Sequence, residues 1–385
     1  MIYIFGFSVF LLVYIYILYP IIIFCIKQPQ IKKIIELKEP SIVIIVPAHN
    51  EEQVIQEKLD NHLKLNYKNY KVLVISDTST DQTSNIVSKY VKQYPEKIML
   101  NEVFDGLGKT NAINKSLKGL DCDILVFSDA NVYLKNDALQ QVSKSFCDNN
   151  VGGVAGQLIY TNDDLEGSAE SNGLYWKYEE SIKMSESNTG SMMGADGSIF
   201  AIRRDLYREL PVHVLDDFCT STGIITQGYE LKFNDDIVAY EKGAESTNEE
   251  FPRKIRISNR SYNSYKFMKS EFLKELSLFN LWKMYSHKVL RWYSLLFMVI
   301  ALISNIYLSI TLASPFWLST AISHITFYLV AIISWMGYFP RIPILKKLAT
   351  IIEYFVMVNV AAGIGVSQSI LGVKTITWKK ASSTR

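Results

Sequence analysis

Three short apolar runs in the first third of the chain are each followed directly by polar or acidic residues. The runs are Ile42–Val46, Lys71–Ser76 and Ile124–Phe127. Continuous Val/Ile-rich segments bounded by turn residues are typical of strands that are buried on both faces. The pattern between these runs indicates helices over Glu51–Lys64, Thr83–Gln93 and Thr110–Gly119. Strands that alternate with helices predict βαβ units, and therefore an α/β fold with a parallel sheet.

Acidic residues stand where the predicted strands end. Asp77 follows the second run, Asp129 follows the third, and Asp216-Asp217 come after a later apolar stretch. The carboxyl ends of neighbouring parallel strands meet at one edge of a sheet, and ligands bind at that edge in open α/β folds. Several carboxylates there indicate a divalent cation and a phosphate-bearing substrate, because hard cations take oxygen ligands and bridge phosphates.

The chain also contains long segments with little or no charge. Ile2–Ile26 carries no charged residue and is long enough to span a bilayer. A cleaved signal peptide is the alternative, but no Lys or Arg precedes the run, the run is too long, and no small-x-small site follows it. We therefore expect a retained anchor. Trp292–Leu312 and Phe316–Tyr338 are expected to be two further spans.

Charges beside the spans predict an orientation. Lysines follow the first span directly, so the positive-inside rule places the central domain in the cytoplasm. The last apolar segment, Leu348–Leu371, contains Glu353 and other polar residues, and a fourth span would put the basic tail outside. We expect this segment to lie in the membrane interface, with a true span as the alternative. The expected parts are an anchor (1–27), a cytoplasmic α/β domain (40–260), an amphipathic interface segment (261–291), a membrane region (292–372) and a basic tail (373–385).

Charge and cysteine usage argue against several classes of protein. A net charge of +2 does not favour nucleic-acid binding. The four cysteines show no CxxC or other metal-ligand spacing, and Cys219 is interpreted as a buried filler. The Gly106–Thr110 segment lacks the GxxxxGK[ST] spacing, which excludes a P-loop ATPase.

The order of the polar motifs resembles that of the inverting family 2 glycosyltransferases. The motifs are Pro47-Ala48-His49-Asn50-Glu51-Glu52, Ser76-Asp77-Thr78-Ser79, Phe127-Ser128-Asp129-Ala130-Asn131 and Leu215-Asp216-Asp217. The similarity covers roughly residues 40 to 295 and is closer to the membrane-bound branch with the cellulose, hyaluronan and poly-N-acetylglucosamine synthases and the succinoglycan-type transferases. It implies a GT-A fold, with a mostly parallel sheet and helices on both faces, and Mg²⁺ or Mn²⁺ as cofactor.

The resemblance also implies a nucleotide-sugar site at the first two strand ends. The family binds the uracil of the nucleotide sugar with a loop that matches Pro47, His49, Asn50 and Glu51, and binds the nucleotide with an aspartate that matches Asp77. For Asn50 the alternative role is to cap the following helix. The family usually has Asp-Gly-Ser where this chain has Asp-Thr-Ser.

Two further motifs match the part of the family that handles the diphosphate. A Gly-Lys before a helix presents its lysine, here Lys109, to the phosphates, where the helix dipole adds to its charge; the alternative is an exposed lysine. Asp129 and Asn131 occupy the metal-binding Asp-x-Asp position. An asparagine carbonyl still binds a hard cation but adds no charge, which lowers the expected metal affinity. The alternative for this motif is a plain turn at a strand end.

The catalytic base is expected from the pair Asp216-Asp217. It matches the Glu-Asp pair of the processive synthases, in which the second acid is the general base. Asp217 would therefore take the acceptor proton, with Asp216 as its supporting partner; a helix N-cap pair is the alternative. Asp196, in the loop Gly194–Gly197, is expected near the sugar, although a strand-entry turn explains the same residues.

The Gln-x-x-Arg-Trp motif of the related synthases is incomplete in this chain. Its spacing falls on Arg253–Ile257, without the glutamine and the tryptophan, and Arg256 is expected to hold the diphosphate. Arg291, in Arg291-Trp292 at the membrane edge, is the alternative. Because the missing tryptophan stacks on the acceptor in the relatives, its absence weakens the case for processive synthesis.

The sequence therefore predicts a membrane-bound inverting glycosyltransferase that moves a sugar from a nucleotide-diphospho-sugar to a glycan acceptor in exopolysaccharide or capsule synthesis. A UDP-sugar is the expected donor, and the cell membrane is the expected location, with the catalytic domain in the cytoplasm. One alternative is a non-processive transferase that adds a single sugar to a lipid or lipid-linked acceptor. Another is an inactive scaffold of a polysaccharide-synthesis complex.

Overall fold

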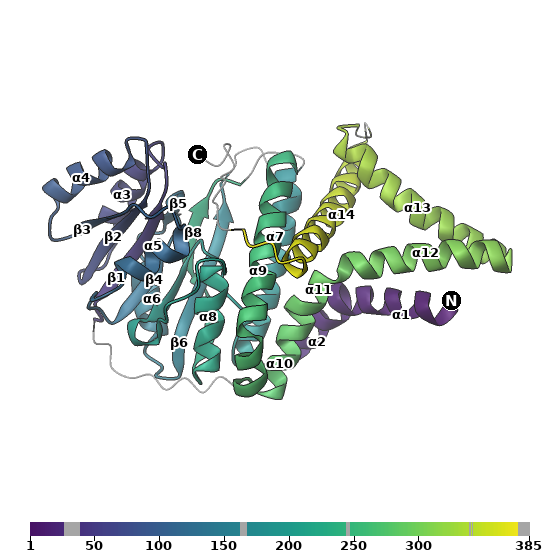
Figure 1. The fold of residues 1–385 in the computed structure, drawn as a ribbon, viewed down its shortest axis with the longest axis horizontal. Coiled ribbons are helices and arrows are strands. Elements are labelled where there is room, and N and C mark those ends of the chain that lie inside the picture. Colours follow the sequence, from purple (N-terminus) through teal and green to yellow (C-terminus); the bar gives the residue numbers. More distant parts are fainter. Residues whose placement is uncertain (27–38, 162–167, 244–246, 339, 341, 376–385) are drawn as a thin grey trace.

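The computed structural model describes residues 1–26, 39–161, 168–243, 247–338, 340 and 342–375 (Figure 1). The lysines after the first apolar segment and most of the basic tail lie outside these residues. An α/β part with a single sheet occupies one end of the molecule, and long apolar helices occupy the other (Figure 1).

The sheet has eight strands in the order β3-β2-β1-β4-β7-β6-β8-β5. In chain order they are β1 (Ile42–Ala48), β2 (Tyr70–Asp77), β3 (Ile98–Val103), β4 (Ile124–Phe127), β5 (Val132–Leu134), β6 (Val151–Tyr160), β7 (Phe200–Arg203) and β8 (Glu230–Glu241). The strands β3, β2, β1 and β4 are parallel to one another, β7 is antiparallel to both of its neighbours, β6 and β8 are parallel, and β5 is an antiparallel edge strand. The sheet is thus mixed, and its parallel half contains the three strands predicted from the sequence.

Each face of the sheet carries its own apolar core, because successive side chains of a strand point to opposite faces. In β1, Val43 and Ile45 belong to one core, while Ile42, Ile44 and Val46 belong to the other. The first core is covered by α5 (Lys109–Ser116), α8 (Asp216–Thr226) and α9 (Thr247–Glu275), and the second by α3 (Ile55–Leu63), α4 (Thr83–Gln93) and α6 (Ala138–Ser145). The predicted α/β fold with helices on both faces is confirmed.

Two boundaries differ from those expected. The first helix of the domain starts at Ile55 and not at Glu51, because residues 51–54 form a turn that connects the loop after β1 to the helix. The long helix α9 continues through residues 260 and 261, where an interface segment was expected to begin. One helix therefore belongs to both the α/β part and the segment beside the apolar helices.

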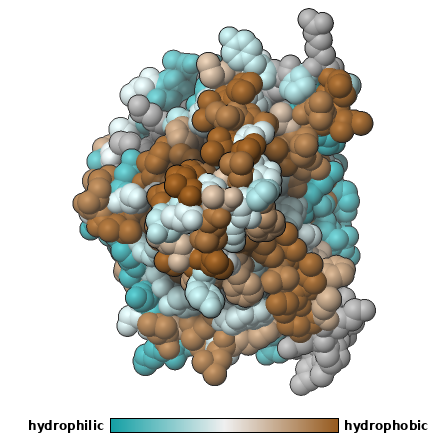
Figure 2. All heavy atoms as spheres, turned by 90° about the vertical axis from the view of Figure 1, so that its right-hand side faces the viewer, coloured by the Kyte–Doolittle hydropathy of each residue, from teal (hydrophilic) through white to brown (hydrophobic). Residues whose placement is uncertain are grey.

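In the described part of the chain, four helices are long and apolar enough to cross a membrane. They are Ile2–Cys25, which joins α1 (Ile2–Val13), a short π-helical turn and α2 (Tyr19–Cys25), α12 (Ser294–Leu312), α13 (Pro315–Trp335) and α14 (Pro343–Ile370). The helices α1, α12 and α13 extend away from the α/β part (Figure 1), and brown, hydrophobic surface covers much of that end of the molecule (Figure 2).

The fourth apolar helix, α14, is packed differently from the other three. Half of its most apolar window is buried inside the protein, against 11% to 28% for the other helices. It lies along α9, where Asn259 donates a hydrogen bond to the Gly365 carbonyl (3.3 Å) and the Ser369 hydroxyl donates to Asn263 (2.7 Å). This packing joins α14 to the α/β part, and the interfacial interpretation of the segment stays a prediction.

The close approach of α14 and α9 depends on Gly365. A Cβ added at this glycine would lie 2.4 Å from the Ile255 carbonyl oxygen and 2.8 Å from the Asn259 amide nitrogen, so two backbones would have to separate. We predict that Gly365→Ala lowers the free energy of unfolding by about 1–3 kcal/mol, the usual cost of overpacking. Thermal unfolding in detergent measures the effect. Gly6→Ala in α1, where a Cβ meets nothing within 4 Å, is the matched control and should not lower the midpoint, because alanine is the better helix former.

Candidate active site

The parallel strands bring the predicted site residues to one edge of the sheet. β1, β2 and β4 end at Ala48, Asp77 and Phe127, and all three point the same way. The loops that follow them therefore meet above this edge, and they carry two groups of site residues. One group lies at the ends of β1 and β2, and the other lies beyond β4.

The first group is a set of loops tied together by hydrogen bonds. His49 Nδ1 lies 2.6 Å from the Asp77 carbonyl oxygen, and the side-chain oxygen of Asn50 accepts the Thr80 amide at 2.7 Å. Asn50 has a left-handed backbone (φ 53°), which asparagine tolerates better than most residues. It therefore joins the loops after β1 and β2 and does not cap α3, whose N-cap is Val54.

The remaining members of this group are buried at the same edge. Pro47 is part of β1, and Glu51 is 1% exposed, with its amide donating to the Thr83 hydroxyl at 2.7 Å. Burial raises the pKa of the Asp77 carboxyl, and a hydrogen bond from the Thr78 hydroxyl opposes that shift. Of this group, only Glu51 reaches the pocket described below.

The second group is centred on Lys109, the first residue of α5. Its ammonium lies 2.9 Å from Asp129 and 3.3 Å from Asp216, and its side chain is 13% exposed. Burial alone would lower the pKa of Lys109, but the carboxylates of Asp129, Asp216 and Asp217 raise it above its ordinary value. Lys109 is therefore a buried, charged lysine and not the exposed one that the sequence left open.

Gly197 marks the point around which this group is arranged. A Cβ built on this glycine would lie 3.2 Å from Asp217 Oδ2, 3.4 Å from Asp129 Oδ2 and 3.5 Å from Lys109 Nζ. Two carboxylates and an ammonium thus surround one small space, and the missing side chain of Gly197 keeps that space open. The three groups come from separate segments of the chain, so no single motif predicts that they meet.

Asp217 lies in the first turn of α8, where the helix dipole favours a negative charge. Its carboxylate accepts a hydrogen bond from the Phe218 amide at 2.6 Å. Burial and the neighbouring charge of Asp216 nevertheless raise the pKa of Asp217 to about 7, against the lowering effect of Lys109. A carboxyl with this pKa exchanges protons near neutral pH, as a general base must.

Asp196 lies in the loop before β7 and forms an ion pair with the buried Lys183 of α7 (Ser168–Asn188), while its own side chain stays 41% exposed. Burial alone would lower the pKa of Lys183, but Asp196 raises it. This ion pair anchors the loop to α7, and the negative charge of Asp196 also helps to raise the pKa of Asp217.

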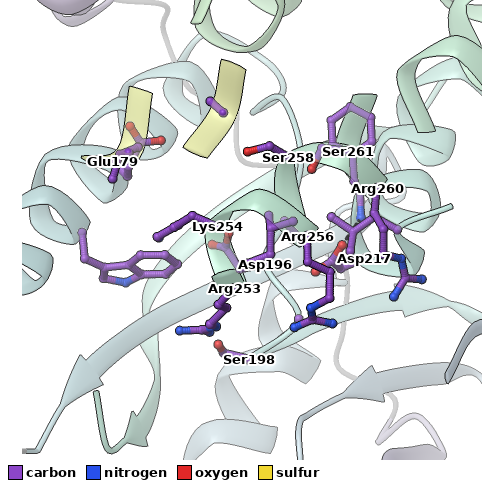
Figure 3. Close-up of a pocket in the computed structure, with 18 of the residues that line it drawn as sticks. Glu179, Asp196, Ser198, Asp217, Arg253, Lys254, Arg256, Ser258, Arg260 and Ser261 are labelled. Atoms are coloured by element: carbon purple, nitrogen blue, oxygen red, sulfur yellow. Dashed lines mark hydrogen bonds between the residues drawn. The ribbon is translucent and has the colours of Figure 1, made fainter. Parts of the chain in front are cut away.

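These groups line a pocket of about 350 Å³ (Figure 3). The pocket lies between the edge of the sheet and the helices α7, α9 and α14, which also contribute lining residues. Of the residues predicted from the sequence, it brings together Glu51, Lys109, Asp129, Asn131, Asp196, Asp216, Asp217 and Arg256. Pro47, His49, Asn50 and Asp77 lie at the same edge but outside this lining.

Helix α9 supplies a row of cations to the pocket. Arg253, Arg256 and Arg260 are spaced by three and four residues, so they share one face of the helix (Figure 3). Arg253 pairs with Glu250, and Arg260 binds the Thr110 hydroxyl and the Val214 carbonyl. Arg256 has no ion pair with any described residue. Burial and the charges of Arg260 and Arg253 lower its pKa to about 10.

Arg291, the alternative to Arg256, also reaches the pocket but is already engaged. Its guanidinium forms an ion pair with Glu179 of α7, and Glu179 in turn lies 3.1 Å from His287 Nε2. His287 Nδ1 contacts Glu186 at 2.8 Å, and Glu186 accepts the Tyr19 hydroxyl at 2.5 Å. This buried network connects the first apolar helix to the wall of the pocket.

Several lining residues were missed by sequence reasoning. The spacing of Arg253, Arg256 and Arg260 is a signal that could have identified a basic helix face. Glu241 gave no such signal, because it reaches the site only through strand pairing. Nor did Tyr16, Val358, Asn359 and Ala362, which line the pocket from the long apolar helices.

Oxygen donors suited to a cation are present beyond β4. Asp129 and Asn131 offer a carboxylate and an amide, although no three His, Cys, Asp or Glu side chains of the described residues gather as a metal site. Mg²⁺ and Mn²⁺ commonly bind to one or two protein oxygens and complete their shell with water and substrate phosphates. The donor set therefore fits a cation that binds together with a phosphorylated substrate.

The mixed sheet, with acidic loops at the carboxyl ends of its parallel strands, has the GT-A glycosyltransferase fold. The model of the family described as Glycosyl transferase family 2 matches residues 43–211. These residues therefore form a family 2 glycosyltransferase domain, and the predicted enzyme class is confirmed.

Relatives with assigned functions are similar over different shares of the chain. The poly-beta-1,6-N-acetyl-D-glucosamine synthase of Staphylococcus epidermidis is 22% identical over 74% of this chain and 69% of its own length. The beta-monoglucosyldiacylglycerol synthase of Nostoc sp. is 34% identical, but over only 30% of this chain and 25% of its own length. The mannosyltransferase PcManGT from Pyrobaculum calidifontis, solved in complex with GDP-Man and Mn²⁺, shares the fold, with a TM-score of 0.70, 20% identity, and coverage of 96% of this chain and 99% of its own.

The open space beside Gly197 can be tested directly. We predict that Gly197→Ala reduces transferase activity about tenfold, because its methyl group would fill the space between Asp217, Asp129 and Lys109 and press on the Asp217 carboxylate. Gly197 does not have a left-handed φ, so the substitution should not strain the backbone. Nucleoside diphosphate release and thermal unfolding measure the two effects. Gly173→Ala in α7, which meets nothing within 4 Å, is the control, and equal activity of both variants would contradict the role of this space.

Proposed function

We propose that the protein is a membrane-bound inverting glycosyltransferase that moves a sugar from a nucleotide-diphospho-sugar to a glycan acceptor in exopolysaccharide or capsule synthesis. One observation carries the proposal: Lys109, Asp129 and Asp217 surround a single small space at the sheet edge. Lys109 is suited to phosphate, and Asp217 is suited to a hydroxyl proton. Both would act on substrates that meet at that space.

In this proposal Asp217 is the general base. It takes the proton of the acceptor hydroxyl as the acceptor oxygen forms its bond to the anomeric carbon. The bond between that carbon and the diphosphate oxygen breaks on the opposite side, which inverts the configuration. Lys109 and Arg256 neutralise the charge that develops on the leaving nucleoside diphosphate, and preorganised charges of this kind are commonly the largest source of catalysis. Asp216 holds Lys109 in place.

The donor would lie along the edge from β2 to β4. The loops with Pro47, His49, Asn50 and Glu51, together with Asp77, would hold the nucleoside, and Asp196 would lie near the sugar. Asp129 and Asn131 would hold Mg²⁺ or Mn²⁺, which supplies Lewis-acid stabilisation of the phosphate oxygens. A UDP-sugar is the expected donor, whereas the fold neighbour PcManGT was solved with GDP-Man. A donor panel must therefore contain both nucleotides.

The acceptor is proposed to approach from the membrane side. The pocket continues from the acidic group to Tyr16 and Asn359, which belong to two of the helices long enough to span a bilayer. The aromatic residues Tyr175, Trp176 and Trp292 also line it and could stack on sugar rings. We place the protein in the cell membrane, multi-pass, with the α/β part in the cytoplasm.

A second candidate is favoured by the same membrane-side wall. It is a non-processive transferase that adds one sugar to a lipid or lipid-linked acceptor, as the name of the Nostoc relative describes for diacylglycerol. The length of the product separates the two: a polymer made by the purified enzyme supports the synthase, and a single added sugar supports the second candidate.

The first experiment measures nucleoside diphosphate release by purified membranes that contain the enzyme, over a panel of UDP- and GDP-sugars with Mn²⁺ or Mg²⁺. We expect release from one donor, and we expect Asp217→Asn to lower its rate by about 10²–10⁴-fold, the usual contribution of a positioned base. Donor affinity should change little, since Asp217 contacts the acceptor in this scheme. Nucleotide binding without turnover of any donor would favour the inactive scaffold instead.

The pH dependence gives a further prediction. Asp217 acts only when it is deprotonated, and its pKa is raised to about 7. We expect kcat/KM to fall by about tenfold for each pH unit below this value, because the deprotonated fraction falls in that proportion. Asp216→Asn removes the like charge that helps to raise the pKa of Asp217, so the acidic limb should move to lower pH. An unmoved limb would show that another group titrates.

A further inference from the structure

Asn131 stands where the related enzymes carry the second carboxylate of their metal motif, and it has a specific partner. Its side chain is buried, at 6% exposure, and its Nδ2 donates a hydrogen bond of 2.9 Å to Oε1 of Glu241. Glu241, the last residue of β8, is also buried and lines the same pocket as Asp129 and Asn131. The two residues are brought together by strand pairing, because Val132 of β5 is in register with Glu241.

This hydrogen bond fixes which way the amide of Asn131 points. A carboxylate only accepts hydrogen bonds, so the atom that faces Glu241 must be the NH₂ group. The carbonyl oxygen Oδ1 then lies on the other side of the planar amide, away from Glu241. A hard cation binds that oxygen and not the NH₂ group. Glu241 therefore holds Asn131 in the orientation in which it can be a ligand.

The pair also keeps the charge that the motif has lost. Two acids in an Asp-x-Asp motif carry two negative charges, and Asp129 with Glu241 carries the same two. Beneath them the Lys58 ammonium of α3 donates to the Ser128 hydroxyl at 2.7 Å and to the Val132 carbonyl. Burial lowers the pKa of Lys58 to about 7, and the carboxylates of Asp129 and Glu241 oppose that shift. Ser128, just before Asp129, and Val132, just after Asn131, thus bind the same buried lysine.

We propose that Glu241 is a positioning residue of the divalent-cation site, which orients Asn131 toward the cation and supplies the second negative charge. The inference rests on the proposed function, since it concerns the cation that Asp129 and Asn131 would hold. It gives a physical reason for an amide in the metal motif beside Asp129.

The pairing predicts how substitutions depend on one another. In Asn131→Asp the restored acid would face Glu241 at hydrogen-bond distance, and two carboxylates there repel each other. In Glu241→Gln a charge is lost, and the new amide can donate to Asn131 Oδ1, so the amide of Asn131 is no longer fixed. In the double variant, the glutamine donates to the new aspartate, and the pair is restored with its roles exchanged.

The experiment measures Mn²⁺ binding to the purified full chain in detergent, with UDP or GDP present to complete the cation site. Electron paramagnetic resonance detects the free hexaaqua Mn²⁺, and Mn²⁺ with the nucleotide but without protein gives the baseline. We expect Glu241→Gln and Asn131→Asp each to weaken binding by about tenfold, as loss of a partner that orients a metal ligand commonly does. The double variant should return to within about threefold of the wild type. Asp129→Asn should abolish binding at this site, so the signal of free Mn²⁺ should stay at its protein-free level. Asp235→Asn is the control, because Asp235 lies on the exposed part of β8, the strand that ends at Glu241. It should leave Mn²⁺ binding unchanged.

Other outcomes would overturn the inference. Tighter binding by Asn131→Asp alone, an unchanged affinity in Glu241→Gln, or no rescue in the double variant would each show that Glu241 does not position Asn131. Absence of Mn²⁺ binding by the wild type would do the same, while donor turnover in that case would leave the proposed transferase intact. Normal Mn²⁺ binding without turnover of any donor would count against the proposed function and not against the pair. Thermal unfolding of each variant reports whether its fold is kept.

Discussion

The ion pairs of Lys109 are the interaction on which the site depends. A buried ammonium is costly unless carboxylates surround it, and here they come from the loop after β4 and from the start of α8. Asp129 can reach Lys109 only because β4 is parallel to β1 and ends at the same edge as the loop before α5. Asp216 and Asp217 reach it only because α8 begins beside that edge. The sheet topology therefore brings the charged groups of the site together.

Helix α9 imposes a second constraint, because it serves two parts of the molecule at once. One face carries Arg253, Arg256 and Arg260 into the pocket, while Asn259 and Asn263 bind α14. Arg260 also holds the start of α8 through the Val214 carbonyl. A shift of the apolar helices against the α/β part would thus move the arginines of α9 and the proposed base, Asp217, together. The position of the apolar helices is in this way coupled to the geometry of the pocket.

Sequence reasoning was most successful where the signal is local. The strands β1, β2 and β4 and the helix α4 follow from runs of apolar residues and their spacing. The acidic residues at strand ends predicted a site at the edge of the sheet, where the structure brings Asp129, Asp217 and Lys109 together. It failed where the decisive contact is made between elements distant in the chain. For Asn50 the sequence left a helix-capping role as an alternative, because residues near it in the chain do not predict that it accepts a hydrogen bond from Thr80. Glu241 is 110 residues from Asn131, and no local pattern connects them.

The Asn131–Glu241 pair shows how a departure from a motif should be judged. Considered alone, Asn131 in place of the second carboxylate indicates a lower affinity for the metal and favours the inactive scaffold. In the folded chain the charge is present on a different strand, hydrogen-bonded to the amide and lying over the same buried lysine. Electrostatics acts through space and does not depend on which segment carries the charge. The site should therefore be compared with its relatives by the charges and donors that face the pocket, and by that measure the departure at Asn131 is compensated.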